Sequence, residues 1–185
     1  MNDALCSLWA KTTSEPDNGK FHPLILHMLD VAACTQEILR REPPGTIRII
    51  SRKLGIKPRQ VKDLACLISA CHDIGKASPG FQMKWPGFSS AVPGQHFHLP
   101  RIPNCEINHA YASQLALKAW LRRQSVTEPI ASVLSMAAGC HHGTRPSSHE
   151  LNLLDEDISA IGDGSWTLTR AEIIDEIGLL FPLPE

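Results

Sequence analysis

Five histidines and one aspartate stand out in this 185-residue chain, because each lies where a helix is expected to end, begin or face inward. They are His27, His72, Asp73, His109, His141 and His142. Imidazole nitrogens and carboxylate oxygens together suit divalent transition metals. A lone histidine in an apolar helix is more often a satisfied core residue than a ligand. The inference of a metal site therefore depends on the whole set.

The adjacent pair His72-Asp73 is the centre of this set, because it ends an apolar helix and precedes Ile-Gly-Lys. Neighbours in mid-helix diverge by about 100°, whereas a helix end lets them converge. His72 and one oxygen of Asp73 can then bind one ion, and the second oxygen can reach another. Gly75 permits a sharp turn. Lys76 brings an ammonium to the same rim, where it suits a phosphate oxygen or a metal-bound water.

The other histidines are expected to approach the same centre from different helices. His27 lies among apolar neighbours that turn it inward, His109 opens a helix, and His141-His142 closes another before Gly143. Mixed His and Asp ligation favours one or two ions of Mn, Fe, Co, Ni or Zn, with Mg less favoured. Two ions about 3.5–4 Å apart would activate a water and stabilise the oxygens at phosphorus. The predicted chemistry is phosphoester hydrolysis.

The elements that must position these residues are helices, because apolar residues recur at spacings of three and four along the chain. Helices are predicted over 22–41, 58–72, 107–123 and 127–139, with prolines at the first turn of the first two. A last helix is predicted from Thr169, where Thr169 and Glu172 form a capping box. The fold class is therefore all-α, a helical bundle around a shared site.

Residues 79–103 break this pattern, since they are rich in Gly, Pro and Ser and lack a sustained period. A long loop inside a compact domain is usually functional or disordered. Trp85 or Phe97 of this loop could stack on the bases of a DNA strand. Residues 50–61 resemble a helix-turn-helix. However, the second helix runs into the predicted core, which favours a plain helix pair.

Five further polar residues need an interpretation. His22 is expected to have a structural role at a helix start. Asp30 either orients a ligand histidine or faces solvent. His96, His98 and His149 are expected to be ordinary loop residues.

Composition limits the possible partners. Net charge is −1, so contact with nucleic acid needs a local basic patch. Candidate patches are Arg52, Lys53, Lys57 and Arg59, then Lys118, Arg122 and Arg123, although all of these also fit solvated helix faces. The six cysteines form no CxxC pair and are expected to be reduced and structural. No segment is typical of a membrane span or secretory signal, which predicts a cytoplasmic protein.

The motifs together resemble a known superfamily. His27 with Val31-Ala32, His72-Asp73-Ile-Gly-Lys76, His109 and His141-His142-Gly143 are similar in order and spacing to the HD phosphohydrolases. More restrictive are Trp9-Ala-Lys11, Phe81-Gln82, Asn108-His109 and Gly-x-His-His-Gly. These resemble the N-terminal HD nuclease domain of the type I CRISPR-associated helicase-nucleases.

The resemblance implies an HD-domain bundle with metal-dependent cleavage of single-stranded DNA. The DNA would be the displaced strand of an R-loop, fed by a helicase domain after recruitment by the Cascade surveillance complex. His27, His72 and Asp73 would serve one metal. Asp73 would bridge to a second metal, which His109, His141 and His142 would hold. Asp73 and Lys76 would be the catalytic residues, with Lys76 as an auxiliary group near the phosphate or the attacking water.

One departure from this family is the lack of its later aspartate, which stands in an Ala-Asp-Trp-like context. The chain ends at Glu185 without it, so we expect residues 1–185 to be a single HD nuclease domain truncated before its last helices and without a helicase domain. Two alternative hypotheses stay open. One is an HD phosphohydrolase of nucleotides or cyclic nucleotides, and the other is an inactive HD scaffold.

Overall fold

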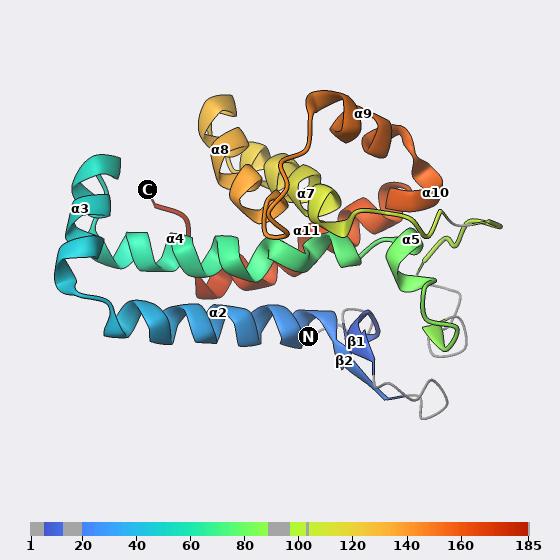
Figure 1. Ribbon diagram of the computed structural model, residues 1–185, viewed down its shortest axis with the longest axis horizontal. Helices are drawn as coiled ribbons and strands as arrows, with labels where there is room; N and C mark the ends of the chain where they lie inside the picture. Colours follow the sequence, from blue (N-terminus) through green and yellow to red (C-terminus); the bar gives the residue numbers. More distant parts are fainter. Residues whose placement is uncertain (1–5, 13–19, 89–96, 103, 185) are drawn as a thin grey trace.

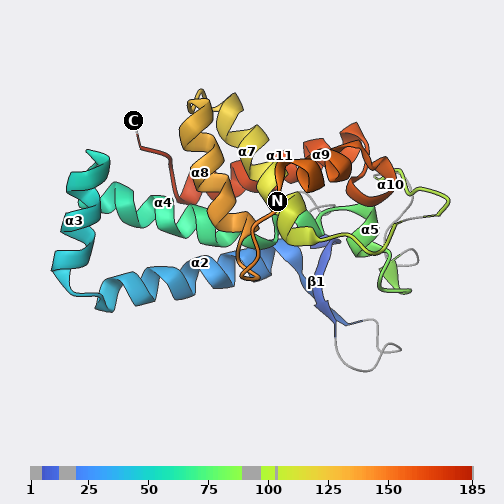
Figure 2. The ribbon, with the colours of Figure 1, turned by 45° about the horizontal axis from the view of Figure 1, so that its top comes forward.

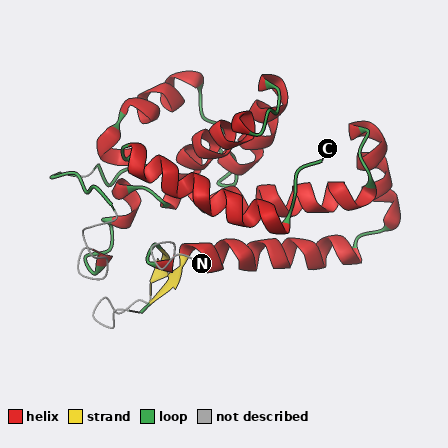
Figure 3. Ribbon diagram, turned by 180° about the vertical axis from the view of Figure 1, so that it is seen from behind, coloured by secondary structure: helices red, strands yellow, loops and turns green. Residues whose placement is uncertain are grey.

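The computed structural model describes residues 6–12, 20–88, 97–102 and 104–184, and helices make up most of it (Figure 1). The strands of the described residues form one short antiparallel pair, β1 (Trp9–Thr12) and β2 (Phe21–Pro23). Figure 3 shows this small hairpin at one end of the helical body. The all-α prediction is confirmed.

Two long helices form the base of the fold. Helix α2 (Leu24–Arg41) runs antiparallel to α4 (Pro58–Ala70), and α3 (Pro44–Leu54) joins them (Figures 1 and 2). Gly55 ends α3 at φ +70°, a left-handed conformation that glycine adopts without strain. The inner face of α4 is buried, with Val61, Leu64, Cys66, Leu67 and Ala70 in the core. Helices α3 and α4 are therefore a plain helix pair, because this core face cannot enter a DNA groove.

The chain tightens after α4 into the 3-10 helix η2 (Cys71–Lys76), which is the centre of the fold. Around it pack α2, α7 (His109–Arg123), α8 (Glu128–Gly139) and α11 (Gly164–Leu180). A β-carbon on Gly75 would overlap the carbonyl oxygen of His109 and lie 2.6 Å from Ser113 N. Glycine at this position lets η2 approach the first turn of α7.

Three shorter helices complete the described fold, α5 (Pro79–Gln82), α9 (Ser148–Glu156) and α10 (Ile158–Ile161). Part of the predicted loop 79–103 is thus helical, and residues 89–96 and 103, with His96, lie outside the described residues. Trp85 and Phe97 are only 6% exposed, so the prediction that they offer stacking surfaces for DNA is wrong. Trp85 packs on Trp9 and Phe21, and Phe97 on Trp166, because burial of these large rings stabilises the core.

Two predicted helix starts are also wrong. Helix α2 begins at Leu24, since His22 and Pro23 belong to β2, paired with β1. The last helix begins at Gly164, five residues before Thr169, because the Asp163 carboxylate accepts a hydrogen bond from Ser165 N at 2.9 Å and caps it. Thr169 lies inside the helix, where its hydroxyl donates to Ser165 O.

In the part of the chain that the structure describes, no helix has the length and apolar character of a membrane span. All six cysteines are free, and Cys66 and Cys71 are buried in the core. These two are structural, as expected.

Candidate metal centre

Asp73 is the centre of a histidine cluster, and its carboxylate is almost completely buried, with 4% of the residue exposed. Its Oδ2 atom lies 3.0 Å from His27 Nε2 and 3.1 Å from His72 Nε2. Its Oδ1 atom lies 3.2 Å from His109 Nε2 and 3.5 Å from His141 Nε2. Each oxygen of the one carboxylate therefore faces a different pair of imidazoles.

Local structure explains how these side chains converge. The tight 3-10 turn of η2 places His72 and Asp73 side by side at the end of α4. His27 points inward from the first turns of α2 and is 8% exposed. His109 is the first residue of α7, which Asn108 caps by accepting a hydrogen bond from Ala110 N at 3.1 Å. His141 follows the end of α8.

Two of the imidazoles are held by backbone carbonyls. His72 Nδ1 lies 2.8 Å from Ser69 O, and His141 Nδ1 lies 2.7 Å from Ala138 O. A carbonyl oxygen only accepts hydrogen bonds, so each Nδ1 carries the proton. In the neutral ring, Nε2 then holds a lone pair that points at Asp73, as in metal-ligating histidines.

This arrangement fits a cation between the imidazoles and the carboxylate. Lone pairs on His72 Nε2 and Asp73 Oδ2 face each other at 3.1 Å, and they repel unless a proton or a metal ion separates them. His141 Nε2 is buried and has no hydrogen-bond partner among the described residues, since its 3.5 Å approach to Asp73 lacks hydrogen-bonding geometry. A buried polar atom without a partner is costly, and a metal ligand bond would satisfy it.

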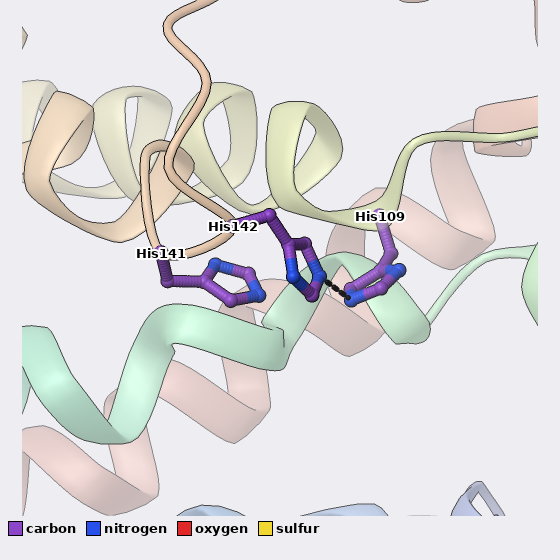
Figure 4. Close-up of side chains that lie close together, drawn as sticks. All are labelled: His109, His141 and His142. Carbon is purple, nitrogen blue, oxygen red and sulfur yellow. Dashed lines mark hydrogen bonds between the residues drawn. The ribbon is translucent and has the colours of Figure 1, made fainter.

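The second half of the cluster consists of three imidazoles. Figure 4 shows His109, from the start of α7, beside His141 and His142, from the turn after α8, with a dashed line from His142 to His109. That line joins the two Nε2 atoms at 3.0 Å. The ligand atoms of these three histidines lie within 4.8 Å of one another, and so do those of His27, His72 and Asp73. The donors thus form two groups of three, of the kind that divalent transition metals accept.

Burial alone would raise the pKa of Asp73, but the close imidazoles of His109, His141 and His72 and the Lys76 ammonium outweigh burial and hold the pKa far below its usual range. The carboxylate is therefore ionised at neutral pH. Burial lowers the pKa of His27 and outweighs the opposite effect of Asp73. The pKa of His141 is raised, because the Asp73 carboxylate and the Ala138 carbonyl outweigh burial.

Burial, and then the neighbouring imidazoles, lower the pKa of His142. Low pKa values at His27 and His142 favour the neutral rings that metal binding needs.

Lys76 is inside the cluster and not at an open rim. It is 8% exposed, and its Nζ lies 2.7 Å from Asp73 Oδ2 and 3.3 Å from Ala10 O. The ammonium also lies 5.2 Å from the centre of the Phe81 ring. Lys76 thus neutralises the carboxylate oxygen that faces His27 and His72.

Buried hydrogen bonds of Gln82 join strand β1 to Lys76, the last residue of η2, and we call this set the buried clamp. Residue-by-residue reasoning on the sequence did not predict it. Gln82 Oε1 accepts from Trp9 N at 3.0 Å, and Nε2 donates to Trp9 O at 2.9 Å and Lys76 O at 2.8 Å. Trp9 Nε1 donates in return to Gln82 O at 2.9 Å. The motifs Trp-Ala-Lys and Phe-Gln carried the signal, but only as a resemblance, because 73 residues separate the partners.

The remaining polar candidates lie outside the cluster. Asp30 accepts from His22 at 2.9 Å, so it orients this histidine and no ligand of the cluster. His98 lies on the surface beside Asp163. Of the basic patches, Lys118 and Arg122 pair with Glu128, which makes them part of an ion-pair network on the helix surface.

Comparisons with known proteins agree with this geometry. The family model described as "Cas3, HD domain" matches residues 9–183. A curated relative, the CRISPR-associated endonuclease/helicase Cas3 of Thermus thermophilus, is 31% identical over 187 residues, which cover 100% of this chain and 20% of the relative. The chain thus spans about a fifth of the length of that curated relative.

Solved structures show the same fold. A crystal structure of a CRISPR-associated protein is 32% identical with a TM-score of 0.82, over 97% of this chain and 20% of that one. The Thermus thermophilus Cas3 HD domain in the presence of Ni2+ is 28% identical with a TM-score of 0.72, over 99% of this chain and 68% of that one.

T. fusca Cas3 also shares the fold. It is 22% identical with a TM-score of 0.78, over 97% of this chain and 20% of that one. The family match, the helical fold and the histidine cluster lead to one conclusion. The chain belongs to the Cas3 HD-domain family, a family of HD nuclease domains.

Proposed function

We propose that this domain hydrolyses phosphodiester bonds of single-stranded DNA with divalent metal ions held around Asp73. The observation that carries the proposal is the division of the Asp73 carboxylate between two imidazole groups. A carboxylate that faces two donor groups can bridge two cations, which is the arrangement of two-metal phosphodiesterases. Membership of the Cas3 HD-domain family, a family of nuclease domains, supports the assignment to nucleic acid.

The two donor groups define the ligand sets. His27, His72 and Asp73 Oδ2 would hold one ion, and the three imidazoles of His109, His141 and His142 would hold the other beside Asp73 Oδ1. When bound, such ions supply Lewis acidity that activates water and stabilises charge at phosphorus. So many nitrogen donors favour Mn, Co, Ni or Fe over Mg. The related Thermus domain was crystallised in the presence of Ni2+.

The chain's own residues orient the donors in this site. The Ser69 and Ala138 carbonyls hold the rings of His72 and His141 with Nε2 turned toward Asp73. Lys76 holds Asp73 Oδ2 from the interior side and is only 8% exposed. We infer that Lys76 orients the Asp73 carboxylate beside the scissile phosphate.

The substrate and partners follow from the relatives. One relative is called an endonuclease/helicase, and a chain of this fold is part of a CRISPR RNA-guided surveillance complex in a pre-nicking state. We infer that this domain acts in type I CRISPR interference, on the displaced DNA strand of a surveillance complex, with a helicase domain that feeds the strand.

The test is cleavage of circular single-stranded DNA with Mn2+, Co2+, Ni2+ or Mg2+, beside a panel of nucleotides and cyclic nucleotides. Circular DNA reports endonuclease activity without free ends. We expect metal-dependent cleavage by the parent protein, and its loss in Asp73→Asn and His72→Ala. His149→Ala is the matched control, because His149 is an exposed histidine outside both donor groups.

Two outcomes would reject the proposal. Release of phosphate from nucleotides while DNA stays intact would make the domain a nucleotide phosphohydrolase. Absence of both activities, together with no bound metal by elemental analysis, would make it a scaffold.

A further inference from the structure

A small groove beside the metal centre has no role in the site described above. It has a volume of about 230 Å³ and is lined by Lys11, Thr12, Lys20, Phe21 and His22, which we call the hairpin groove. The β1–β2 pairing forms it, since Lys11 is the register partner of His22 and Thr12 that of Phe21. Residues on both strands of one hairpin thus form the walls of a single hollow.

The hairpin groove carries positive charge from two lysines that have no acidic partner among the described residues. Lys11 and Lys20 are exposed, and neither forms an ion pair with any residue that the structure describes. The surface cations Lys118 and Arg122 differ from these lysines, because both pair with Glu128. An unpaired ammonium at a groove is available to a phosphate.

The groove adjoins the metal centre on the side of His27. Strand β2 leads directly into α2, and the ring of His22 meets the ring of His27 edge-on, with centroids 6.1 Å apart. His27 in turn lies 3.0 Å from Asp73 Oδ2. A strand bound with one phosphodiester at Asp73 can therefore continue across His22 into the hairpin groove.

Two further residues define what the groove would bind. Phe21 is half-buried against Trp85, with ring centroids 5.4 Å apart, and it offers the groove an aromatic surface. A cationic groove with an aromatic side chain is the usual design for single-stranded nucleic acid. The Nε2 atom of His22 is already hydrogen-bonded to the Asp30 carboxylate. We therefore assign the phosphate contacts to the two lysines.

We propose that the hairpin groove binds the DNA backbone next to the scissile phosphodiester, with Lys11 and Lys20 on its phosphates and Phe21 beside a base. This inference rests on the proposed function, because it takes single-stranded DNA as the substrate. It adds a binding surface outside both donor groups.

The first test is DNA affinity of Lys11→Ala/Lys20→Ala, measured without metal by fluorescence anisotropy of a labelled thymidine oligonucleotide at several salt concentrations. The matched control is Lys53→Ala/Lys57→Ala, which removes the same charge from exposed positions at the far end of the molecule, around α3 (Figure 1). Loss of two phosphate contacts should weaken binding roughly tenfold at low salt and reduce the salt slope by about 1.4. The control should bind as the parent does.

The second test separates binding from chemistry. Bis(p-nitrophenyl) phosphate is a diester without flanking phosphates, so kcat/KM for it should stay unchanged in the groove variant while DNA cleavage falls. Equal affinity and equal salt slope in the groove and control variants would overturn the proposal, as would a parent protein that does not bind the oligonucleotide. Binding through the groove without cleavage of any diester would instead reject the proposed function alone.

Discussion

Replacement of Gln82 by leucine tests whether the buried clamp holds the metal-binding loop in place. The Gln82 side chain is 0% exposed and makes three hydrogen bonds, to Trp9 N, Trp9 O and Lys76 O. Leucine has a similar size but no polar atoms, so it keeps the packing and removes all three bonds. The substitution therefore isolates the polar contribution of the clamp.

The expected loss follows from the groups that remain. Each buried polar group left without a partner costs about 1–3 kcal/mol. The Lys76 carbonyl keeps a hydrogen bond from Ser78 N, so the groups that lose a partner are Trp9 N and Trp9 O. Two such groups amount to about 2 kcal/mol at the low end. We expect this low value, because the hydrogen bond from Trp9 Nε1 to Gln82 O uses the backbone of residue 82 and survives. Against a typical stability of about 5–15 kcal/mol, such a loss is large.

The assay is urea unfolding of the metal-free protein, followed by circular dichroism. Gln82→Leu should lower the free energy of unfolding by about 2 kcal/mol with an unchanged slope on urea concentration. The control is Gln60→Leu, which removes one exposed hydrogen bond from Lys57 N at the start of α4 and should cost less than about 1 kcal/mol. A loss below about 1 kcal/mol in Gln82→Leu, or equal losses in both variants, would refute the reasoning.

Three other predictions concern the loop, the ligands and the thiols. Gly75→Ala should lower the free energy of unfolding by about 1–3 kcal/mol in the same urea assay, because the new methyl group meets backbone atoms of α7; an unchanged midpoint would contradict this. His141→Ala should reduce the amount of Mn2+ or Ni2+ retained after dialysis, measured by elemental analysis, whereas His149→Ala should retain the parent amount. Burial raises the pKa of the Cys71 thiol to about 12, so the thiol stays neutral below that pH and should resist maleimide in the native protein. Exposed Cys34 should react. Peptide mass mapping measures both, and early labelling of Cys71 would contradict the prediction.

Much of the helical architecture follows from local patterns in the sequence. The apolar spacing in 58–72 and 107–123 predicts helices that the structure contains with shifts of two residues at most, apart from the 3-10 turn that replaces the last residues of the first. The chemical types of the six cluster residues are also visible, because histidine and aspartate at helix ends are local features. Local capping signals were ambiguous where two competed. Asp163 caps the last helix although Thr169 and Glu172 have the pattern of a capping box.

Tertiary packing decided the features that depend on distant residues. Trp85 and Phe97 are in a Gly- and Pro-rich segment that predicts a loop, yet both are buried, because Trp9 and Trp166 supply aromatic partners from far along the chain. Strand β2 replaces the predicted first turn of α2 because β1 is there to pair with it.

The sequence by itself determined which groups are available for chemistry and which helices carry them, since residue type and periodicity are properties of short segments. Only the folded chain decided how the two oxygens of Asp73 are divided, with Oδ2 toward His27 and His72 and Oδ1 toward His109 and His141. That division depends on the close packing of η2 against α2, α7 and α8. Contacts between segments tens of residues apart leave no periodic trace in any one of them.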